Sequence, residues 1–480
     1  MRVLACLLAV AAATGALCAA AARARSPLQI GAVVPELTVR ALVGPTIEKM
    51  TDSGLDGAGR VTLTWKRGQK ALDPGQQSDL QYAVQQAADK GIDIYLTVYP
   101  DGPKDTPRTP AARRMFAAWV AGIVGHIPEL KHVIIGNEPN INRFWLPQFD
   151  RKGKDVAAPA YELLLARSYD AIKRVAPSVE VIGGALSHMG INKPGSGRDT
   201  IAPQKFLLDL GKAYRETKRQ QPIMDAFAFH PYLEHANLPP TYEHYSPRVI
   251  TIADYGRLVS LLGRAFNGTA QVGSKLPIVY AEFGVESRIP DALLAAYTGT
   301  EPATTRPVNE SVQARFYAKA MQMAACQPTV RTFLVFRLID EAIRGGWQSG
   351  VYYANGSPKA SLPGVEEAAR RLAEQRPTAC TTLLAPEPMV SFFPVRRPSS
   401  RFPTMEPIRL LCDADCRYEV RLMKGSSTVA IVRGKAIAGM RKKIGLTPNP
   451  LTPGTYRIMI RAKATAFRAN EFVASRKFTF

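Results

Sequence analysis

The pattern of apolar and polar positions divides the chain near residue 385. Before that point, short apolar runs alternate with stretches in which apolar residues recur every three or four positions, as at Leu80, Val84 and Ala87. The runs predict eight strands, at 30–34, 60–65, 92–99, 132–135, 180–184, 226–229, 277–281 and 332–336. The stretches predict helices at 76–90, 109–125, 159–176, 203–219, 250–266, 308–325 and 363–375, with a weaker helical pattern at 44–55.

Eight strands alternating with about eight helices favour a (β/α)8 TIM barrel, an α/β fold that typically takes about 250 residues and accepts loop insertions. A doubly wound open sheet is the alternative. No Gly-rich phosphate loop follows the first predicted strand, which argues against the nucleotide-binding form of that sheet. We therefore expect a closed barrel within a domain that spans residues 26–385.

The pattern after residue 385 differs. Prolines crowd residues 386–407, which predicts a linker. Residues 408–480 then contain only strand-like segments, in which apolar and polar residues alternate, as at Tyr456, Ile458 and Ile460. This pattern favours a small C-terminal β-sandwich.

The N-terminus resembles an export signal. Arg2 precedes a short apolar run, and an Ala-rich stretch follows it, so residues 1–24 are predicted to be a signal peptide. Cleavage as a lipoprotein before Cys18 is not expected, because the preceding Leu17 is bulky. The apolar run is too short to span a bilayer, and no later stretch is long enough, so no transmembrane segment is expected. We expect a secreted protein, extracellular or associated with the cell envelope.

Removal of that signal leaves four of the six cysteines. Export permits disulfides, and four cysteines allow three pairings. We favour Cys412–Cys416, which closes a tight loop, and Cys326–Cys380, which joins the ends of two helical segments. A zinc site is the alternative, but neither a second close cysteine pair nor a nearby histidine supports it.

Composition excludes some classes and leaves the charge to be explained. Apolar residues make up 46% and charged residues 21% of the 480 positions, which argues against disorder and against a fibrous repeat. The formal net charge is +22, and residues 386–480 carry 18 Lys/Arg against 6 Asp/Glu. An ordinary solvated surface is one interpretation, and adhesion to an anionic cell wall or polysaccharide is another. Nucleic acid is not expected as a partner, because no binding motif accompanies the charge.

Candidate chemistry lies where the predicted strands end. In a (β/α)8 barrel these ends meet at one mouth. The fourth strand is followed by Asn137 and Glu138, the sixth by His230 and Tyr232, and the seventh by Glu282. Two facing carboxyl groups suit the hydrolysis of a glycosidic bond, because one can protonate the leaving oxygen while the other attacks or directs water. Arg60, near the start of the second strand, is placed to keep a carboxylate charged.

These residues resemble those of glycoside hydrolase clan A, the retaining (β/α)8 glycosidases that include families five and thirty-nine. The resemblance covers roughly residues 28–375 and implies that Glu138 is the acid/base and Glu282 the nucleophile. It also implies substrate or positioning roles for Asn137, Arg60, His230 and Tyr232. The segment Gly346–Tyr352 with the following Ser357-Pro358-Lys359 resembles the segment after strand eight in many members. Neither a metal nor an organic cofactor is implied.

One departure from the clan pattern concerns the sugar platform. Strand eight usually ends with a tryptophan, but here Phe336 occupies that region. Phe336 is one substitute, and Trp347, reaching in from the loop, is another. Trp145, after the Asn-Glu-Pro loop, is a further candidate for substrate binding. Glu286 is the alternative nucleophile near Glu282.

The sequence therefore predicts a secreted hydrolase that cleaves a β-linked oligo- or polysaccharide with retention, with carboxyl groups about 5 Å apart. A barrel that binds glycans or cell wall without cleaving them is the alternative from another class, and a transglycosylase is the third. Asp340 and Glu341, after strand eight, are expected either to bind substrate or to cap their loop.

Overall fold

The computed structural model describes residues 27–375 except 245 and 247, residues 377 and 380, and the segments 408–410, 416–437, 442–446, 452–464 and 472–479. The predicted signal peptide, the predicted linker and Cys412 lie outside the described residues, and the proposed domain boundaries stay predictions. None of the described helices is both long and apolar enough to cross a membrane.

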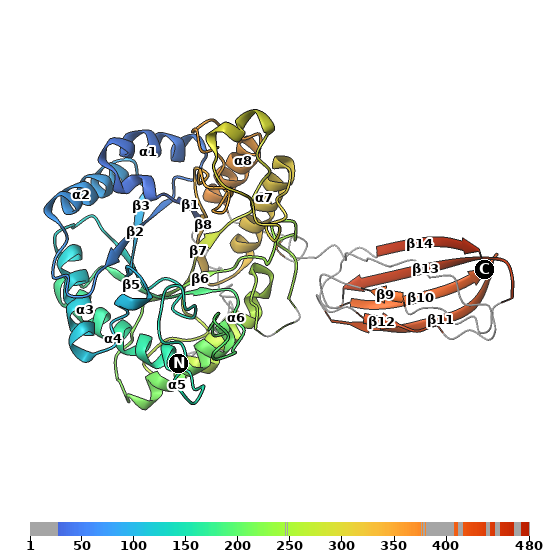
Figure 1. Ribbon diagram of the computed structural model, residues 1–480, viewed down its shortest axis with the longest axis horizontal. Helices are drawn as coiled ribbons and strands as arrows, with labels where there is room; N and C mark the ends of the chain where they lie inside the picture. Colours follow the sequence, from blue (N-terminus) through green and yellow to red (C-terminus); the bar gives the residue numbers. More distant parts are fainter. Residues whose placement is uncertain are drawn as a thin grey trace, which may run out of the picture.

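The first part of the chain forms a closed parallel barrel (Figure 1), and the predicted fold class is confirmed. Each strand pairs with the next one along the chain, and the last pairs with the first. The strands are β1 (Gln29–Val33), β2 (Ala58–Trp65), β3 (Asp93–Pro100), β4 (His132–Ile135), β5 (Glu180–Ser187), β6 (Ala226–His230), β7 (Ile278–Phe283) and β8 (Val330–Val335).

Eight α-helices of the described chain surround this barrel (Figure 1). They are α1 (Val43–Asp52), α2 (Pro74–Ala88), α3 (Pro110–Gly125), α4 (Ala157–Val175), α5 (Pro203–Glu216), α6 (Tyr255–Phe266), α7 (Glu310–Cys326) and α8 (Leu362–Glu374). Helix α6 begins five residues later than its apolar pattern predicts. The cause is local, because Thr251 caps the 3-10 turn Ile252–Asp254 in a capping box with Asp254.

Two apolar layers hold the strands in place. The larger one fills the space between the strands and the helices. The inner one lies inside the barrel and is rich in small side chains, including Ala58, Ala226, Ala228 and Ala281. Because small residues fill the barrel interior, larger polar side chains at the strand ends can converge above them at the mouth.

The C-terminal segments form a four-stranded antiparallel sheet in the order β11-β10-β13-β14 and a two-stranded sheet of β12 and β9. Side chains of both sheets share one apolar core, as the predicted sandwich requires. The strands are β9 (Ile408–Leu410), β10 (Cys416–Lys424), β11 (Ser427–Ala436), β12 (Lys442–Ile444), β13 (Thr455–Ala464) and β14 (Phe472–Thr479).

The predicted disulfide between Cys326 and Cys380 is present, with the two Cα atoms 5.3 Å apart. It ties the end of α7 to the chain after α8. Cys416 is also disulfide-bonded. Its predicted partner, Cys412, lies outside the described residues.

Candidate active site

The first carboxylate of the candidate site stands on a constrained turn after β4. Gly136 has a φ of 96°, and a Cβ there would lie 2.9 Å from the Tyr161 ring, so glycine suits both the conformation and the space. Glu138 itself has a φ of 40°, and its N–H donates to the Ala185 carbonyl at 2.8 Å. Left-handed backbone at a non-glycine residue costs about 1–3 kcal/mol and persists where the surrounding structure enforces it. The fold thus gives up some stability to aim this side chain.

The second carboxylate reaches the mouth through an irregular strand. Val279 and Ala281 of β7 face the barrel interior, so strict alternation would turn Glu282 toward the helices. The pairing of β7 with β8 shifts register between Tyr280 and Phe283. Such an irregularity re-aims a side chain, and here it brings Glu282 to the mouth.

Glu282 is surrounded by groups that favour its charged form. Arg60 donates from Nη1 to one carboxylate oxygen, and the Tyr232 hydroxyl donates to the other at 3.0 Å. Burial raises the pKa of Glu282, but the charges of His230 and Arg60 and these hydrogen bonds outweigh it and hold the pKa below the ordinary value. Burial, together with the same carboxylate, raises the pKa of Tyr232 well above normal, so the tyrosine keeps its proton to donate.

Arg60 also ties the two strand ends together. Its Nη2 donates to Asn137 Oδ1 at 2.9 Å, its Nε to Thr97 Oγ1 at 2.6 Å, and its Nη1 to the Ala281 carbonyl at 3.2 Å. The guanidinium is 2% exposed, whereas the Glu282 side chain is 12% exposed. The positioning group is therefore buried, while the carboxylate it positions still reaches the mouth.

His230 bridges the two carboxylates. Its Nδ1 lies 3.1 Å from Glu138 Oε1 and 3.4 Å from Glu282 Oε2. The ring is fully buried, so the water available to compete with these contacts is limited. Nδ1 thus faces both acids, and this contact fixes their relative placement.

The two carboxylates face each other at short range. Glu138, His230 and Glu282 each offer one ligand-type atom within 4.8 Å of the others. Three such groups at this spacing are able to coordinate a cation. However, the Arg60 guanidinium already pairs with Glu282, so a metal ion there would meet a fixed positive charge. The trio is better suited to moving protons than to holding a metal.

The alternative nucleophile, Glu286, belongs to a different environment. Burial and the nearby Glu301 raise its pKa to about 8. A carboxyl group with that pKa is largely protonated at neutral pH and is a poor nucleophile. This difference favours Glu282.

An aromatic wall of Tyr232, Phe336 and Trp347 adjoins the carboxylates. The Trp347 ring centroid lies 5.0 Å from that of Tyr232 and 5.1 Å from that of Phe336. Phe336 and Trp347 are partly exposed. Both substitutes expected for the missing strand-eight tryptophan are thus present together, and Trp347 reaches the wall from its loop.

The structure corrects the prediction for Trp145. Its ring is 1% exposed and packs edge-on against Tyr161 of α4, with centroids 5.9 Å apart. A ring buried on this scale has no face open to a sugar. Its role is in the core beneath the Asn-Glu-Pro loop.

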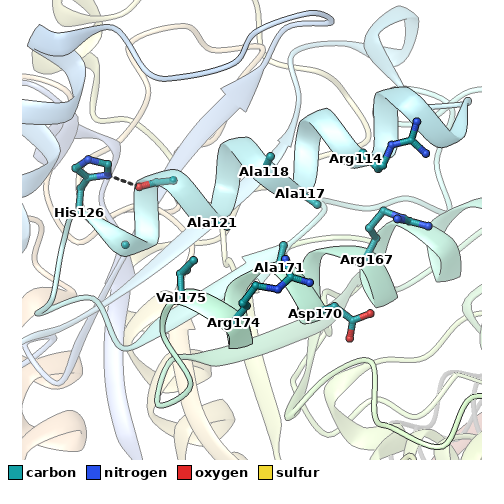
Figure 2. Close-up of a pocket in the computed structure, with 12 residues that line it drawn as sticks. Arg114, Ala117, Ala118, Ala121, His126, Arg167, Asp170, Ala171, Arg174 and Val175 are labelled. Atoms are coloured by element: carbon teal, nitrogen blue, oxygen red, sulfur yellow. Dashed lines mark hydrogen bonds between the residues drawn. The ribbon is translucent and has the colours of Figure 1, made fainter.

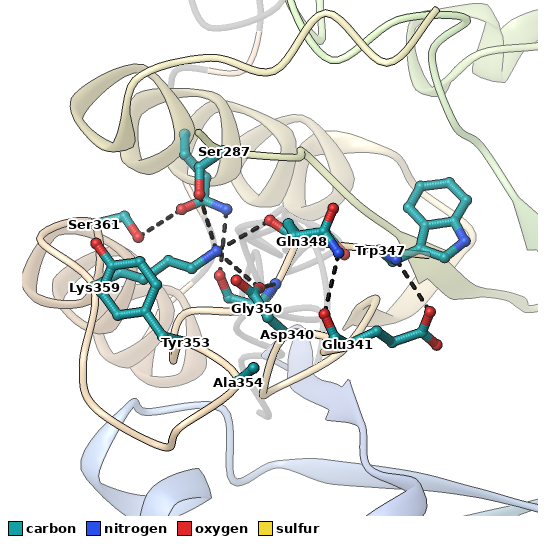
Figure 3. A network of polar contacts seen from close by, with 12 residues as sticks. Ser287, Asp340, Glu341, Trp347, Gln348, Gly350, Tyr353, Ala354, Lys359 and Ser361 are labelled. Carbon is teal, nitrogen blue, oxygen red and sulfur yellow. Dashed lines mark hydrogen bonds and ion pairs between the residues drawn. The ribbon is translucent and has the colours of Figure 1, made fainter. Parts of the chain in front are cut away.

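A buried ion pair holds the loop that carries Trp347 (Figure 3). Lys359 Nζ donates to Asp340 Oδ1 at 2.8 Å, to Ser287 Oγ at 2.9 Å and to the Gln348 carbonyl at 3.0 Å. Both charged side chains are at most 1% exposed. Asp340 therefore caps the loop rather than meeting substrate. Glu341 also caps this loop, because its carboxylate accepts a hydrogen bond from the backbone N–H of Trp347 at 3.1 Å.

Two polar residues near the mouth are missed by the sequence pattern. Thr97 is missed because it lies within the apolar run of β3. A lone threonine in such a run is nevertheless a signal that could have drawn attention to it. His188 follows β5, and its ring centroid is 5.9 Å from that of Tyr232. Burial lowers the pKa of His188 to about 4, so this imidazole is neutral near pH 7. Only tertiary contact connects His188 with the site.

A concavity lies outside the barrel, between α3 and α4 (Figure 2). It measures about 690 Å³ and is lined by alanines with Arg114, Arg167 and Arg174. It contains none of the residues predicted for the site. The candidate chemistry remains at the mouth.

Comparison with known proteins shows which solved structures share this fold. Neither a protein-family model nor a curated protein matches the chain. The chain is similar to the structure of a family 39 glycoside hydrolase from the gut symbiont Bacteroides cellulosilyticus WH2, with a TM-score of 0.51 and 15% identity over 90% of this chain and 73% of that one. It is also similar to GH5_18 from Streptomyces cattleya, solved in complex with Manb1-4GlcNAc, with a TM-score of 0.50 and 15% identity over 73% of this chain and 82% of that one. The chain thus has the barrel fold of the clan A glycoside hydrolases of families 39 and 5.

Proposed function

We propose that this protein is a secreted retaining glycoside hydrolase that cleaves a β-linked oligo- or polysaccharide by double displacement. The observation that carries the proposal is the pair of carboxylates at the ends of β4 and β7, whose oxygens approach within 4.8 Å. Retaining glycosidases need their carboxyl groups about 5–5.5 Å apart, whereas inverting enzymes leave about 6.5–9.5 Å for a water molecule. The predicted signal and the Cys326–Cys380 disulfide support export.

In the first step, Glu282 attacks the anomeric carbon while Glu138 protonates the departing oxygen. Arg60, Tyr232 and His230 favour the ionised form of Glu282, as a nucleophile requires. Glu138 has no arginine contact among the described residues, and the proposed mechanism assigns it the proton that the leaving oxygen receives. The glycosidic C–O bond breaks as the bond to the Glu282 oxygen forms.

In the second step, Glu138 acts as a base. It removes a proton from water, which attacks the anomeric carbon and releases Glu282. Two inversions give net retention. Asn137 is held by Arg60 beside Glu138, where its amide can donate to a sugar hydroxyl. The partly exposed aromatic wall offers one apolar face to the sugar ring.

The test combines a substrate screen with matched variants. Aryl β-glycosides and β-linked polysaccharides are screened first, and NMR then identifies the anomer formed from an active substrate. We expect the β-anomer initially. Glu282→Gln should abolish turnover, and Glu138→Gln should lower kcat/KM for substrates with poor leaving groups by about 10²–10⁴-fold while sparing kcat/KM for those with good leaving groups. Its kcat should fall for both kinds of substrate, because the second step needs Glu138 as a base.

Glu286→Gln is the matched control, because it removes a carboxylate from the loop just after β7 but not from the facing pair. It should keep most of the activity. An active Glu282→Gln enzyme, or initial formation of the inverted anomer, would contradict the mechanism. A chain that is folded but inert toward the whole screen would favour the glycan-binding alternative, and transfer to an added glycan acceptor would favour transglycosylation.

A further inference from the structure

The solvent-facing side of the C-terminal four-stranded sheet is strongly basic. In β10, Tyr418 and Val420 are buried, so the intervening side chains face outward, and β11 and β13 alternate in the same way. Among the described outward positions there is a single acid, Glu419. The outward cations are Arg417, Arg421, Arg433, Lys435, Arg457, Arg461, Lys463 and Lys477.

Strand pairing gathers five of these cations at one end of the sheet. Arg417 of β10 lies opposite Lys435 of β11 on one side and Lys463 of β13 on the other. The next outward row places Glu419 between Arg433 and Arg461. Neighbouring strands are about 4.8 Å apart, so each row is a short line of closely spaced charges. We call these six residues the basic rows.

Folding does not require this arrangement. Like charges directly opposite each other on paired strands destabilise a sheet by about 0.2–1 kcal/mol per pair. Glu419 is already engaged by Arg421 at 2.5 Å and Arg433 at 2.7 Å. Within the described part of the chain, no carboxylate pairs with the remaining cations of the basic rows, which are Arg417, Lys435, Arg461 and Lys463.

Protection of sheet edges does not explain the rows either. Lysines on edge strands discourage edge-to-edge pairing. Yet β10 and β13 are the central strands of this sheet, and they carry Arg417, Arg461 and Lys463. The repulsion among these crowded charges is offset if a polyanion lies across them.

The residues around the basic rows indicate which class of polyanion they would bind. The rows border a shallow groove of about 430 Å³. Tyr418 is the one aromatic residue that lines the groove, and it is only 7% exposed. None of the described outward side chains on this face is aromatic, so the face lacks open platforms for stacking bases or neutral sugar rings. Arginine forks match carboxylates and phosphates alike in a bidentate geometry, and the missing aromatic platforms argue against a nucleic acid as the carrier of the charge. We propose that the basic rows bind a linear polysaccharide that carries carboxylates, with the choice of a carbohydrate carrier resting on the proposed function of the barrel.

The experiment uses the full chain and polygalacturonate as the probe. Affinity is measured by titration calorimetry at low and at raised salt, for the parent and for two double variants. The test variant is Arg417→Gln/Lys463→Gln. The control is Arg457→Gln/Lys477→Gln, which removes an equally charged cross-strand pair from the other end of the same face.

We expect the parent to bind polygalacturonate but not neutral dextran. The test variant should bind roughly tenfold more weakly, with a shallower salt dependence, and the control less than twofold more weakly. Neither variant should have a lower thermal midpoint than the parent, because the charges removed are exposed and repel one another. Equal weakening by both pairs would overturn the proposal, since net charge alone would then account for binding.

Two further probes separate other partners. Tighter binding to phosphatidylserine vesicles or to single-stranded DNA than to polygalacturonate would also overturn it. Polygalacturonate binding should be unchanged in Glu282→Gln. A protein that binds polygalacturonate but has no glycosidase activity would refute only the proposed function. An active glycosidase that does not bind polygalacturonate would refute only this inference.

Discussion

Arg60 offers the sharpest test of how the site controls the ionisation of Glu282. We consider Arg60→Met, which preserves much of the buried volume and removes the charge. The guanidinium is 2% exposed and contacts Glu282, Asn137 and Thr97. The variant therefore leaves a mostly buried carboxylate with only Tyr232 and His230 to support its charge.

The magnitude follows from the burial of the pair. Removing one partner of a buried ion pair costs about 3–5 kcal/mol, and one pKa unit corresponds to about 1.4 kcal/mol. If about 3 kcal/mol of the preference for the ionised form is lost, the pKa of Glu282 rises by about two units. Because the pKa of Glu282 in the parent lies below its ordinary value of 4.5, the ionised carboxylate contributes stability above that value. That contribution disappears as the pH falls through the folded-state pKa.

The assay is the pH profile of kcat/KM on an aryl β-glycoside. Activity requires ionised Glu282, so the acid limb of the parent should lie below about pH 4.5, and Arg60→Met should move it up by roughly two units. The variant also loses positioning contacts and should be slower at every pH. The pH at which the acid limb lies, rather than the overall rate, therefore tests the change in the pKa of Glu282. Arg331→Met is the control, because Arg331 pairs with Glu180 at the opposite end of the barrel.

The control should lose stability without moving the acid limb. A folded, active Arg60→Met enzyme whose acid limb stays in place would refute the reasoning. A shift of equal size in Arg331→Met would do so too, because the effect would then be general.

Three further predictions concern the framework of the site. Lys359→Met leaves Asp340 buried without its cation and should lower the free energy of unfolding by about 3–5 kcal/mol, measured by urea denaturation. Trp347→Ala removes one ring of the aromatic wall and should raise KM roughly three- to tenfold with a smaller effect on kcat. The double variant Cys326→Ala/Cys380→Ala removes a cross-link that spans 54 residues and should cost about 4 kcal/mol of stability by loop-closure entropy, seen as an earlier denaturation midpoint.

Each of these has a result that would count against it. Lys131→Met breaks an exposed pair with Asp93 and should change stability by less than about 1 kcal/mol. Equal losses of stability in Lys131→Met and Lys359→Met would show that burial does not strengthen the Lys359–Asp340 pair. A Trp347→Ala enzyme with an unchanged KM would remove the ring from substrate binding. An unchanged denaturation midpoint in Cys326→Ala/Cys380→Ala would show that the cross-link adds no stability.

Much of the architecture is determined by local sequence. The two periodicities, about 3.6 for helices and 2 for strands, are enough to predict the order of elements and the change near residue 385. They also indicate which residues end a strand, and the topology of a parallel barrel brings all such ends to one mouth. For that reason the amino-acid sequence alone suffices to pair Glu138 with Glu282, although 144 positions separate them.

Tertiary structure alone decides how the side chains are aimed. Periodicity by itself would turn Glu282 away from the mouth, and the shifted register of β7 against β8 reverses that. Trp145 and Trp347 both lie on loops that follow strands, yet one is enclosed by α4 and the other is held at the mouth by the Lys359–Asp340 pair. Such outcomes depend on which distant elements pack against a loop, and this information is spread over the whole chain rather than carried by the residue and its neighbours.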